Sequence, residues 1–278
     1  GWRIDWSDKA AGVASLTVEL NLGLASVVFI DDSPVERARV AEALPEVAVP
    51  DWPRNPLIYA DALASLPWFD TAAITSEDSD RTSMYVAERD RRGTRATVGS
   101  MDEWLKSLEV VVTVEPLSEV NLARTAQLLN KTNQFNLHTR RLSERELLSW
   151  SSEADNEVWV LRVADRFGDS GLTGIVGLSL SSDTATVEDF VLSCRVMGKK
   201  VEETMLHVLV TRAGKRGAGS VEAVYLPTPK NVPCLKFFRA SAFSETDENR
   251  FVWDLGNPYD RPDTVELTWA PSPPEALP

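Results

Sequence analysis

Cysteine, histidine and methionine are scarce in this 278-residue sequence, which contains two, two and four of them. Two cysteines, Cys194 and Cys234, are too few to staple a secreted domain and favour a reducing, cytoplasmic compartment. The apolar runs are far shorter than the roughly 20 residues that cross a bilayer, and no signal-peptide pattern opens the chain, so no membrane association is expected. The first residue is Gly1 and not methionine, which predicts that the sequence is a piece of a longer protein.

Basic residues are in the minority, since 29 Lys and Arg stand against 42 Asp and Glu and give a net charge of −13. An acidic chain gains no counterion-release attraction to DNA or RNA, so a nucleic-acid partner is not expected. The stretch from Arg195 to Arg239 reverses the balance, with nine basic and three acidic side chains. This positive zone indicates an anionic partner, although a solvated helix face would show the same pattern.

The composition, with 43% hydrophobic and 26% charged residues, is that of an ordinary globular protein. In the first hundred residues the pattern predicts a helix at 8–20, a buried parallel strand at 26–30, a helix from Ser33 to about Leu44 and a short strand at 47–49. A polar helix is expected at 76–92 and a loop at 93–100. This order is typical of an α/β fold, and we expect the first domain to occupy residues 1–100.

The remainder predicts a second domain at 101–270, followed by a Pro-rich disordered tail at 271–278. The expected strands are 109–115, 158–163, 174–180, 186–193, 221–226 and 251–255. The expected helices are 119–130, 143–150, 199–213 and 233–239, with an irregular segment at 131–141.

Adjacent carboxylates end the first expected strand, at Asp31 and Asp32. Like charges repel, so the pair needs a reason. The carboxyl end of a parallel strand is where α/β sheets bind ligands, and Mg²⁺ would neutralise both side chains there. Equally, one aspartate would assist the cap of the next helix while the other is solvated. The sequence pattern alone leaves both interpretations open.

Two stretches around this pair resemble the third and fourth motifs of haloacid-dehalogenase (HAD) phosphatases, and more narrowly the FkbH-like branch. They are Trp6-Ser-Asp-Lys-Ala10 and Val28-Phe-Ile-Asp-Asp-Ser-Pro-Val-Glu-Arg37. The resemblance implies that Lys9 holds a transferring phosphoryl group and that Asp31 and Asp32 bind Mg²⁺. The family also needs an aspartate nucleophile, which nothing before Lys9 supplies. The chain as it stands should therefore lack phosphatase chemistry, and its first hundred residues would be part of a HAD-like (Rossmannoid) parallel-sheet domain.

The second domain has the element order of a GNAT-type acyltransferase. In that α+β fold the cofactor pyrophosphate lies at the N-terminus of the central helix, where free N–H groups and the helix dipole favour an anion. The corresponding loop matches the family pattern at Arg195 and Gly198, and Lys199 is a further candidate contact. However, Lys200 replaces a small residue of the pattern, which weakens the case for coenzyme A. Further along the chain, Lys230 and Asn231 are candidate ligand contacts before the next helix. The aromatic residues that follow them are expected to lie in the hydrophobic core.

The segment Asn130-Lys-Thr-Asn-Gln-Phe-Asn-Leu-His-Thr-Arg-Arg141 closely resembles a segment of FkbH-like proteins and is dense in hydrogen-bond donors. We expect it to contact substrate or a pantetheine arm, although a polar loop with Asx turns would also explain its composition. The residues expected to make these contacts are Asn133, Gln134, Asn136 and Arg140.

Two further side chains are candidates for chemistry. Cys194 lies at an expected strand-to-helix turn beside Arg195, where a positive environment favours the thiolate and a covalent acyl intermediate. A buried structural cysteine is the commoner alternative. His138 is a candidate general base, whereas His207, with apolar neighbours on a helix, is expected to be structural.

Taken together, the resemblance implies an FkbH-like enzyme of polyketide building-block biosynthesis. Such a protein would dephosphorylate bisphosphoglycerate, a phosphorylated three-carbon substrate, and transfer its glyceryl unit to the thiol of an acyl carrier protein. Mg²⁺ and a phosphopantetheine arm or coenzyme A are the implied cofactors. The alternatives are an acetyl-CoA-dependent GNAT N-acetyltransferase and a non-catalytic module that docks a carrier protein.

Overall fold

The structure is a computed structural model that describes residues 2–4, 7–20, 22–69, 87, 90–91, 94–95 and 98–270. Its contacts divide the chain into two compact units, Gly1–Ile74 and Thr75–Pro278. The domain boundary that the sequence predicts near residue 100 stays a prediction. Most of the helix expected at 76–92, and the whole tail expected at 271–278, lie outside the described residues.

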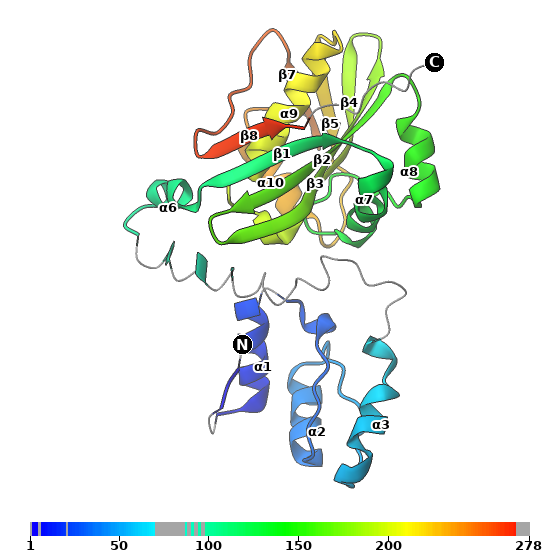
Figure 1. The fold of residues 1–278 in the computed structure, drawn as a ribbon, viewed down its shortest axis with the longest axis vertical. Coiled ribbons are helices and arrows are strands. Elements are labelled where there is room, and N and C mark those ends of the chain that lie inside the picture. The colour runs from blue at the N-terminus through cyan, green and yellow to red at the C-terminus, as the bar shows by residue number, and fades with distance from the viewer. Residues whose placement is uncertain are drawn as a thin grey trace. The chain divides into compact units, whose positions relative to one another are not determined.

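The first unit is largely helical where it is described. It contains α1 (Lys9–Leu20), α2 (Pro34–Ala43), α3 (Tyr59–Ala64) and short 3-10 turns at Leu24–Ser26, Pro56–Ile58 and Pro67–Phe69 (Figure 1). The helices predicted at 8–20 and from Ser33 onward are confirmed. Ser33 caps α2 as expected, because its side chain accepts a hydrogen bond from the Glu36 N–H at 3.4 Å.

The strand predicted at 26–30 is wrong as a buried strand. The segment forms a single parallel bridge, between Val28 and Ala48, and residues 27–30 are only half-buried. The short strand expected at 47–49 is reduced to the same bridge. A strand buried on both faces needs neighbours along both edges. Within the described part of this unit, the segment at 27–29 pairs along one edge only, through bonds to Ala48.

An eight-stranded mixed sheet forms the second unit, in the order β6-β7-β5-β4-β3-β2-β1-β8 (Figure 1). Its strands are β1 (Val110–Pro116), β2 (Asn156–Asp165), β3 (Gly168–Ser181), β4 (Thr184–Leu192), β5 (Ser220–Val224), β6 (Ser244–Asp247), β7 (Arg250–Asp254) and β8 (Val265–Trp269). Its helices are α6 (Met101–Leu108), α7 (Glu119–Lys131), α8 (Glu144–Ser151), α9 (Val201–Lys215) and α10 (Val232–Ala240), with a 3-10 turn at Cys194–Val196. The fold is therefore mixed α/β, and each helix and strand predicted between 109 and 255 is confirmed.

Apolar side chains cover the sheet on both faces. One cluster joins the sheet to α6, α9 and α10, and a second joins its opposite face to α7 and α8. Both α7 and α8 begin with capping boxes, formed by Ser118 with Asn121 and by Ser143 with Glu146. Among the helices of the described residues, none is both long enough and apolar enough to span a bilayer.

The parallel pair β4 and β5 positions the candidate site. These strands are paired from Thr184 with Ser220 to Val187 with Ala223, and β4 then continues to Leu192 without β5 but still paired with β3. A register shift against β3 makes Glu188 an extra residue just where the two strands part. The sheet therefore has an internal gap beside the second half of β4, and α9 begins shortly after β4 ends.

Candidate functional site

In the first unit, the structure brings two of the predicted phosphate-site residues together. The Lys9 Nζ, from α1, lies 2.6 Å from the Asp31 Oδ2, and the other Asp31 oxygen accepts the Ser33 N–H at 2.9 Å. Burial acts to raise the pKa of Asp31, but these two hydrogen bonds outweigh it and hold the pKa below its usual range. The same contact raises the pKa of Lys9. Asp32 is exposed beside them.

Asp31 and Asp32 are the two carboxylates that this corner would offer to Mg²⁺. Carboxylate oxygens are the ligands that Mg²⁺ prefers, so the chemistry of Asp31 and Asp32 is suitable. However, both oxygens of Asp31 already have partners, Lys9 and the Ser33 N–H. In the described stretches no group of three His, Cys, Asp or Glu side chains could hold a metal ion. The metal role of the two aspartates stays a prediction.

In the second unit, the gap beside β4 is filled by residues Phe135–Leu137, which we call the inserted strand. The Leu137 N–H donates to the Phe190 carbonyl oxygen at 3.2 Å, and the Leu192 N–H donates to the Phe135 carbonyl oxygen at 2.9 Å. On the side of β5, the Leu226 N–H donates to the Leu137 carbonyl oxygen at 3.1 Å. The polar segment predicted to bind substrate thus forms an antiparallel bridge to β4, between Asn136 and Val191.

Asn231 fastens the inserted strand to the loop after β5. Its Oδ1 accepts hydrogen bonds from the Tyr225 hydroxyl at 2.6 Å and from the Thr228 N–H at 2.8 Å. Its Nδ2 donates to the carbonyl oxygens of Asn136 and Leu226, both at 2.9 Å. Asn231 is fully buried, and all four bonds that its amide can form are made inside the chain. Asn231, which the sequence predicts as a ligand contact, therefore holds the inserted strand to the loop after β5. We call these four hydrogen bonds of Asn231 the clasp.

Most other polar side chains of the 130–141 segment also bond within the chain. Asn136 accepts from the Thr139 N–H at 2.7 Å and donates to the Thr132 carbonyl oxygen at 3.1 Å. Asn133 accepts a hydrogen bond from Arg141. These are the contacts of a polar loop with Asx turns, which is the alternative that the sequence left open. Gln134 is exposed, and no bond from its side chain anchors the segment.

Arg140 reaches the bulge of β4. It forms an ion pair with the buried Asp189 carboxylate, lies 3.9 Å from Glu188, and stacks over the Trp150 ring at 4.5 Å. Because Asp189 is 1% exposed, this pair holds the segment onto the sheet. His138 is half-buried next to it, and nothing in its surroundings tests the predicted general-base role.

The loop before α9 was expected to bind a pyrophosphate, and it is occupied by a carboxylate. The Glu202 Oε1 accepts the Gly198 N–H at 2.6 Å, while Gly198 and Lys200 both have positive φ angles. Arg195 is half-buried and contacts the Ser193 hydroxyl at 3.3 Å. Lys199 is turned inward, with its Nζ 3.2 Å from the Asp165 carboxylate. The predicted anion contacts thus meet acidic or polar groups of the same chain.

Glu202 gives the second unit a distinctive pH dependence. Burial raises the pKa of Glu202, and the proximity of Glu203 adds to the rise, although the Gly198 N–H opposes it. A raised folded-state pKa contributes stability that is present below the unfolded value, near 4.3, and is lost as pH rises through the folded value. Between acidic and neutral pH, we expect the melting temperature of the Glu202→Gln variant to fall less than that of the native chain. An unchanged slope in a pH series of thermal melts would contradict the assignment, and Glu266→Gln, at an exposed position on β8, is the control.

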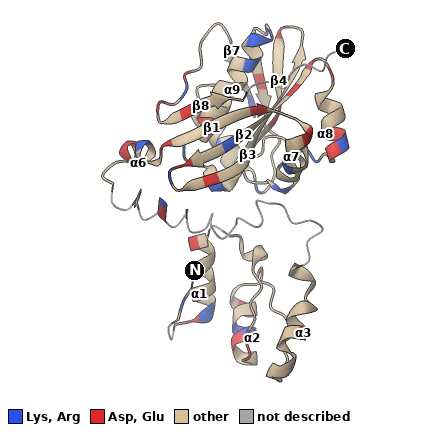
Figure 2. Cartoon of the chain, in the orientation of Figure 1, with Lys and Arg blue, Asp and Glu red and all other residues tan. Residues whose placement is uncertain are grey.

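The positive zone predicted at 195–239 is largely neutralised within the chain. Figure 2 shows basic and acidic residues interspersed over the second unit. The ion pairs are Lys199 with Asp165, Lys200 with Glu203, Arg212 and Arg216 with Glu157, and Arg239 with Glu245. Lys230 and Lys236 are exposed. Lys199, Arg212 and Arg216 therefore find their counter-charges in distant parts of the sequence, whereas Lys200 and Arg239 pair with nearby glutamates.

The two cysteines differ in environment. Cys194 is exposed and lies in the 3-10 turn after β4, so its side chain is accessible, as a reactive thiol requires. Cys234 is buried in α10, and burial raises the pKa of its thiol far above the usual value. The covalent role predicted for Cys194 stays a prediction.

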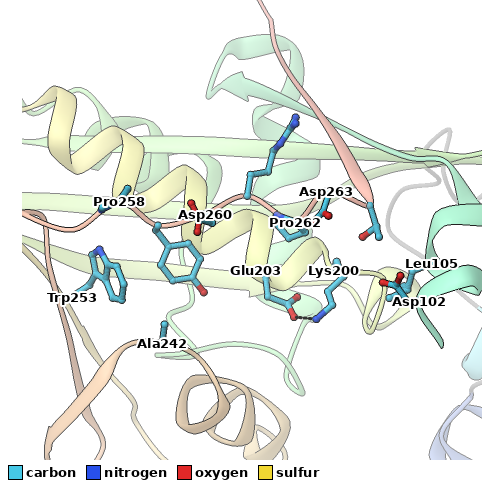
Figure 3. Close-up of a pocket in the computed structure, with 13 residues that line it drawn as sticks. Asp102, Leu105, Lys200, Glu203, Ala242, Trp253, Pro258, Asp260, Pro262 and Asp263 are labelled. Carbon is cyan, nitrogen blue, oxygen red and sulfur yellow. Dashed lines mark hydrogen bonds and ion pairs between the residues drawn. The ribbon is translucent and has the colours of Figure 1, made fainter. Parts of the chain in front are cut away.

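A separate pocket of about 440 Å³ lies at the start of α9, between that helix, α6 and the loop before β8 (Figure 3). It contains Lys200 and Glu203, which pair with one another as the dashed line in Figure 3 shows. The lining includes four acidic residues and two basic ones: Asp102, Glu203, Asp260, Asp263, Lys200 and Arg261. This composition does not favour a phosphate, and no residue predicted as a site lines the pocket.

Comparisons with solved structures give partial likenesses with low TM-scores. No protein-family model matches the chain, and no curated protein does. The N-terminal part of BF1531 from Bacteroides fragilis, containing a phosphatase domain complexed with Mg, is 40% identical over 25% of this chain and 19% of that one, with a TM-score of 0.24. The chain thus spans about a fifth of that structure.

Acetyltransferase structures match about half of the chain. SpeG, a spermidine/spermine N-acetyltransferase from Vibrio cholerae in complex with manganese ions, is 15% identical over 55% of this chain and 95% of that one, with a TM-score of 0.40. The GNAT domain of S. lividans PAT is 15% identical over 51% and 89%, with a TM-score of 0.39. At these scores the likenesses assign no activity, and the functional argument rests on the residues themselves.

Proposed function

We propose that this protein acts in acyl transfer, taking its acyl unit from a phosphorylated three-carbon acid and passing it to the thiol of an acyl carrier protein. The observation that carries the proposal is the ion pair between Lys9 and Asp31. These residues are 22 positions apart, and the fold of the first unit places the lysine ammonium 2.6 Å from the carboxylate at the end of the 27–29 segment. Because about half of the Lys9 side chain is exposed, its ammonium group is suited to donate a hydrogen bond to a phosphate oxygen.

The finer assignments follow from the resemblance to FkbH-like proteins. In the proposal the acyl unit is glyceryl and the phosphorylated acid is bisphosphoglycerate. Asp31 and Asp32 would supply carboxylate ligands for Mg²⁺, which spreads phosphoryl charge when bound. The second unit would then serve as the module that docks the carrier protein.

Replacing Lys9 tests the phosphate-binding role. We expect Lys9→Met to weaken the binding of 3-phosphoglycerate by about tenfold or more, because one charge-assisted hydrogen bond contributes about 1.5–3 kcal/mol. Calorimetric titration of the whole chain gives the affinity. Lys106→Met removes an exposed lysine of α6 that pairs with Asp102, and it should leave the affinity unchanged. Equal affinities for the native chain and the Lys9 variant would refute the assignment.

A second candidate function is acyl transfer from acetyl-CoA to an amine by the second unit. Its supporting observation is the parallel β4–β5 pair, which parts at Val187 with a bulge at Glu188 and is followed by α9. This strand arrangement supports a GNAT-type transferase at least as well as the Lys9–Asp31 pair supports the first candidate. Turnover of acetyl-CoA with a panel of polyamines and peptide amines would favour it, and the absence of turnover would leave the first candidate.

A further inference from the structure

Within the described sheet, the gap between β4 and β5 is the one interior place where an extended ligand would pair with a strand edge. Coenzyme A and the phosphopantetheine arm of a carrier protein share an extended chain with amide groups, which binds by pairing with a strand edge. The backbone groups that such an arm needs are those of Phe190 and Leu192, on the edge of β4 that faces away from β3. The Phe190 carbonyl oxygen and the Leu192 N–H are both already bonded to the inserted strand.

The inserted strand is part of the core and not a surface flap. Phe135 is 2% exposed and Leu137 is fully buried, and both belong to the apolar cluster that includes α9 and α10. The Phe135 ring lies 5.9 Å from that of Phe190 and 5.5 Å from that of Phe237. Moving the strand out would expose these side chains and break the bonds of Asn231 described above.

The far end of the gap is closed to a pyrophosphate as well. There the Glu202 carboxylate takes the Gly198 N–H that an anion would need, and its second oxygen is buried without a partner. A phosphate at this position would lie against an acidic side chain in a buried setting. The inserted strand thus occupies the backbone edge of β4, and the Glu202 carboxylate occupies the Gly198 N–H before α9.

We propose that the inserted strand is a permanent occupant of the β4–β5 gap, so that the second unit accepts neither coenzyme A nor a pantetheine arm along β4. Acyl transfer by this protein would then take place away from that edge. The inference stands independently of the Lys9 proposal, and it limits the second candidate function to donors that bind elsewhere.

Hydrogen exchange of the whole chain tests this directly. We expect the amides of Leu137, Leu192 and Leu226 to exchange as slowly as those paired between β3 and β4, with no change on adding acetyl-CoA at saturating concentration. Selective fast exchange at these three amides, or a change in their exchange caused by acetyl-CoA, would overturn the proposal. If amine acetylation occurred while their protection stayed unchanged, the second candidate function would hold and the gap would still be closed.

Hydrogen exchange in an Asn231 variant tests whether the bonds of Asn231 hold the inserted strand in place. Asn231→Ala should speed exchange at Leu137 and Leu226 by at least about tenfold, because it removes the bonds that join the two segments. Lys236→Ala, an exposed change on the same helix, is the matched control and should have no effect. If the Asn231 variant, unlike the native chain, bound acetyl-CoA, occupation of the gap by the strand would be supported directly. Identical exchange in both variants would contradict the clasp.

Discussion

Asp165→Asn is expected to lower the free energy of unfolding of the second unit by about 3–5 kcal/mol, the usual cost of removing one partner from a buried ion pair. The Asp165 carboxylate is 1% exposed and lies between two buried cations. The Arg91 Nε is 2.6 Å from its Oδ2 and the Arg91 Nη2 is 2.9 Å from its Oδ1, while the Lys199 Nζ is 3.2 Å away. An asparagine keeps the shape but leaves two positive charges facing a neutral amide.

The same group predicts how stability changes with acid. Burial acts to raise the pKa of Asp165, but the hydrogen bond from Arg91 and the charge of Lys199 outweigh it and lower the pKa. A lowered folded-state pKa contributes stability above the unfolded value of about 3.9, and this contribution is lost as pH falls through the folded value. The native chain should therefore lose stability in acid more steeply than the Asp165 variant.

Urea denaturation with hydrogen exchange of the sheet amides measures the effect in the second unit. Asp102→Asn is the matched control, since Asp102 pairs with Lys106 on the surface with 69% of its side chain exposed. Exposed pairs of this kind contribute about 0–1 kcal/mol. If both variants lost the same small amount, the Arg91–Asp165–Lys199 group would not be a stabilising element.

Local patterns predicted most of the second unit because its helices and central strands carry strong periodicity and caps. The elements that were missed have physical reasons. β6 has a polar sequence and is exposed throughout, so it shows no alternation between apolar and polar residues. By contrast, α6 had a usable signal, since Ser100 caps it and Trp104, Leu105 and Leu108 share its buried face. The apolar run at 26–30 predicted a buried strand, but burial depends on neighbours that a local pattern does not specify.

The candidate site shows the same limit more sharply. Polar residue types at 130–141 correctly marked an unusual segment, but the partners that determine its role come from far along the chain. Asn231 meets the carbonyl oxygen of Asn136, and Arg91 meets Asp165, across 95 and 74 positions. Pairings at such separations leave no trace in the spacing of either partner. Side chains that look like ligand contacts in sequence were therefore used to build the sheet, and Asp165 and Glu202 were not singled out at all.

Asn231→Ala should cost the second unit about 3 kcal/mol or more, because it leaves two buried and two partly buried groups without their partner and each buried group costs about 1–3 kcal/mol. The groups affected are the Tyr225 hydroxyl, the Thr228 N–H and the carbonyl oxygens of Asn136 and Leu226. Burial raises the pKa of Tyr225, so its phenol remains a neutral donor to Asn231.

A double-mutant cycle with Tyr225→Phe isolates the central bond of this clasp. Tyr225 is 2% exposed and its hydroxyl lies 2.6 Å from the Asn231 Oδ1, so the two changes should couple by about 0.5–3 kcal/mol in urea denaturation. Tyr259→Phe, at a tyrosine whose ring packs against Phe243 and Trp253, supplies the control cycle and should show additive effects with Asn231→Ala. If the Tyr225 and Asn231 changes were additive as well, the hydroxyl–amide bond would contribute nothing. Strong coupling would instead show that the loop after β5 and the inserted strand are stabilised as one unit, as a permanently filled gap requires.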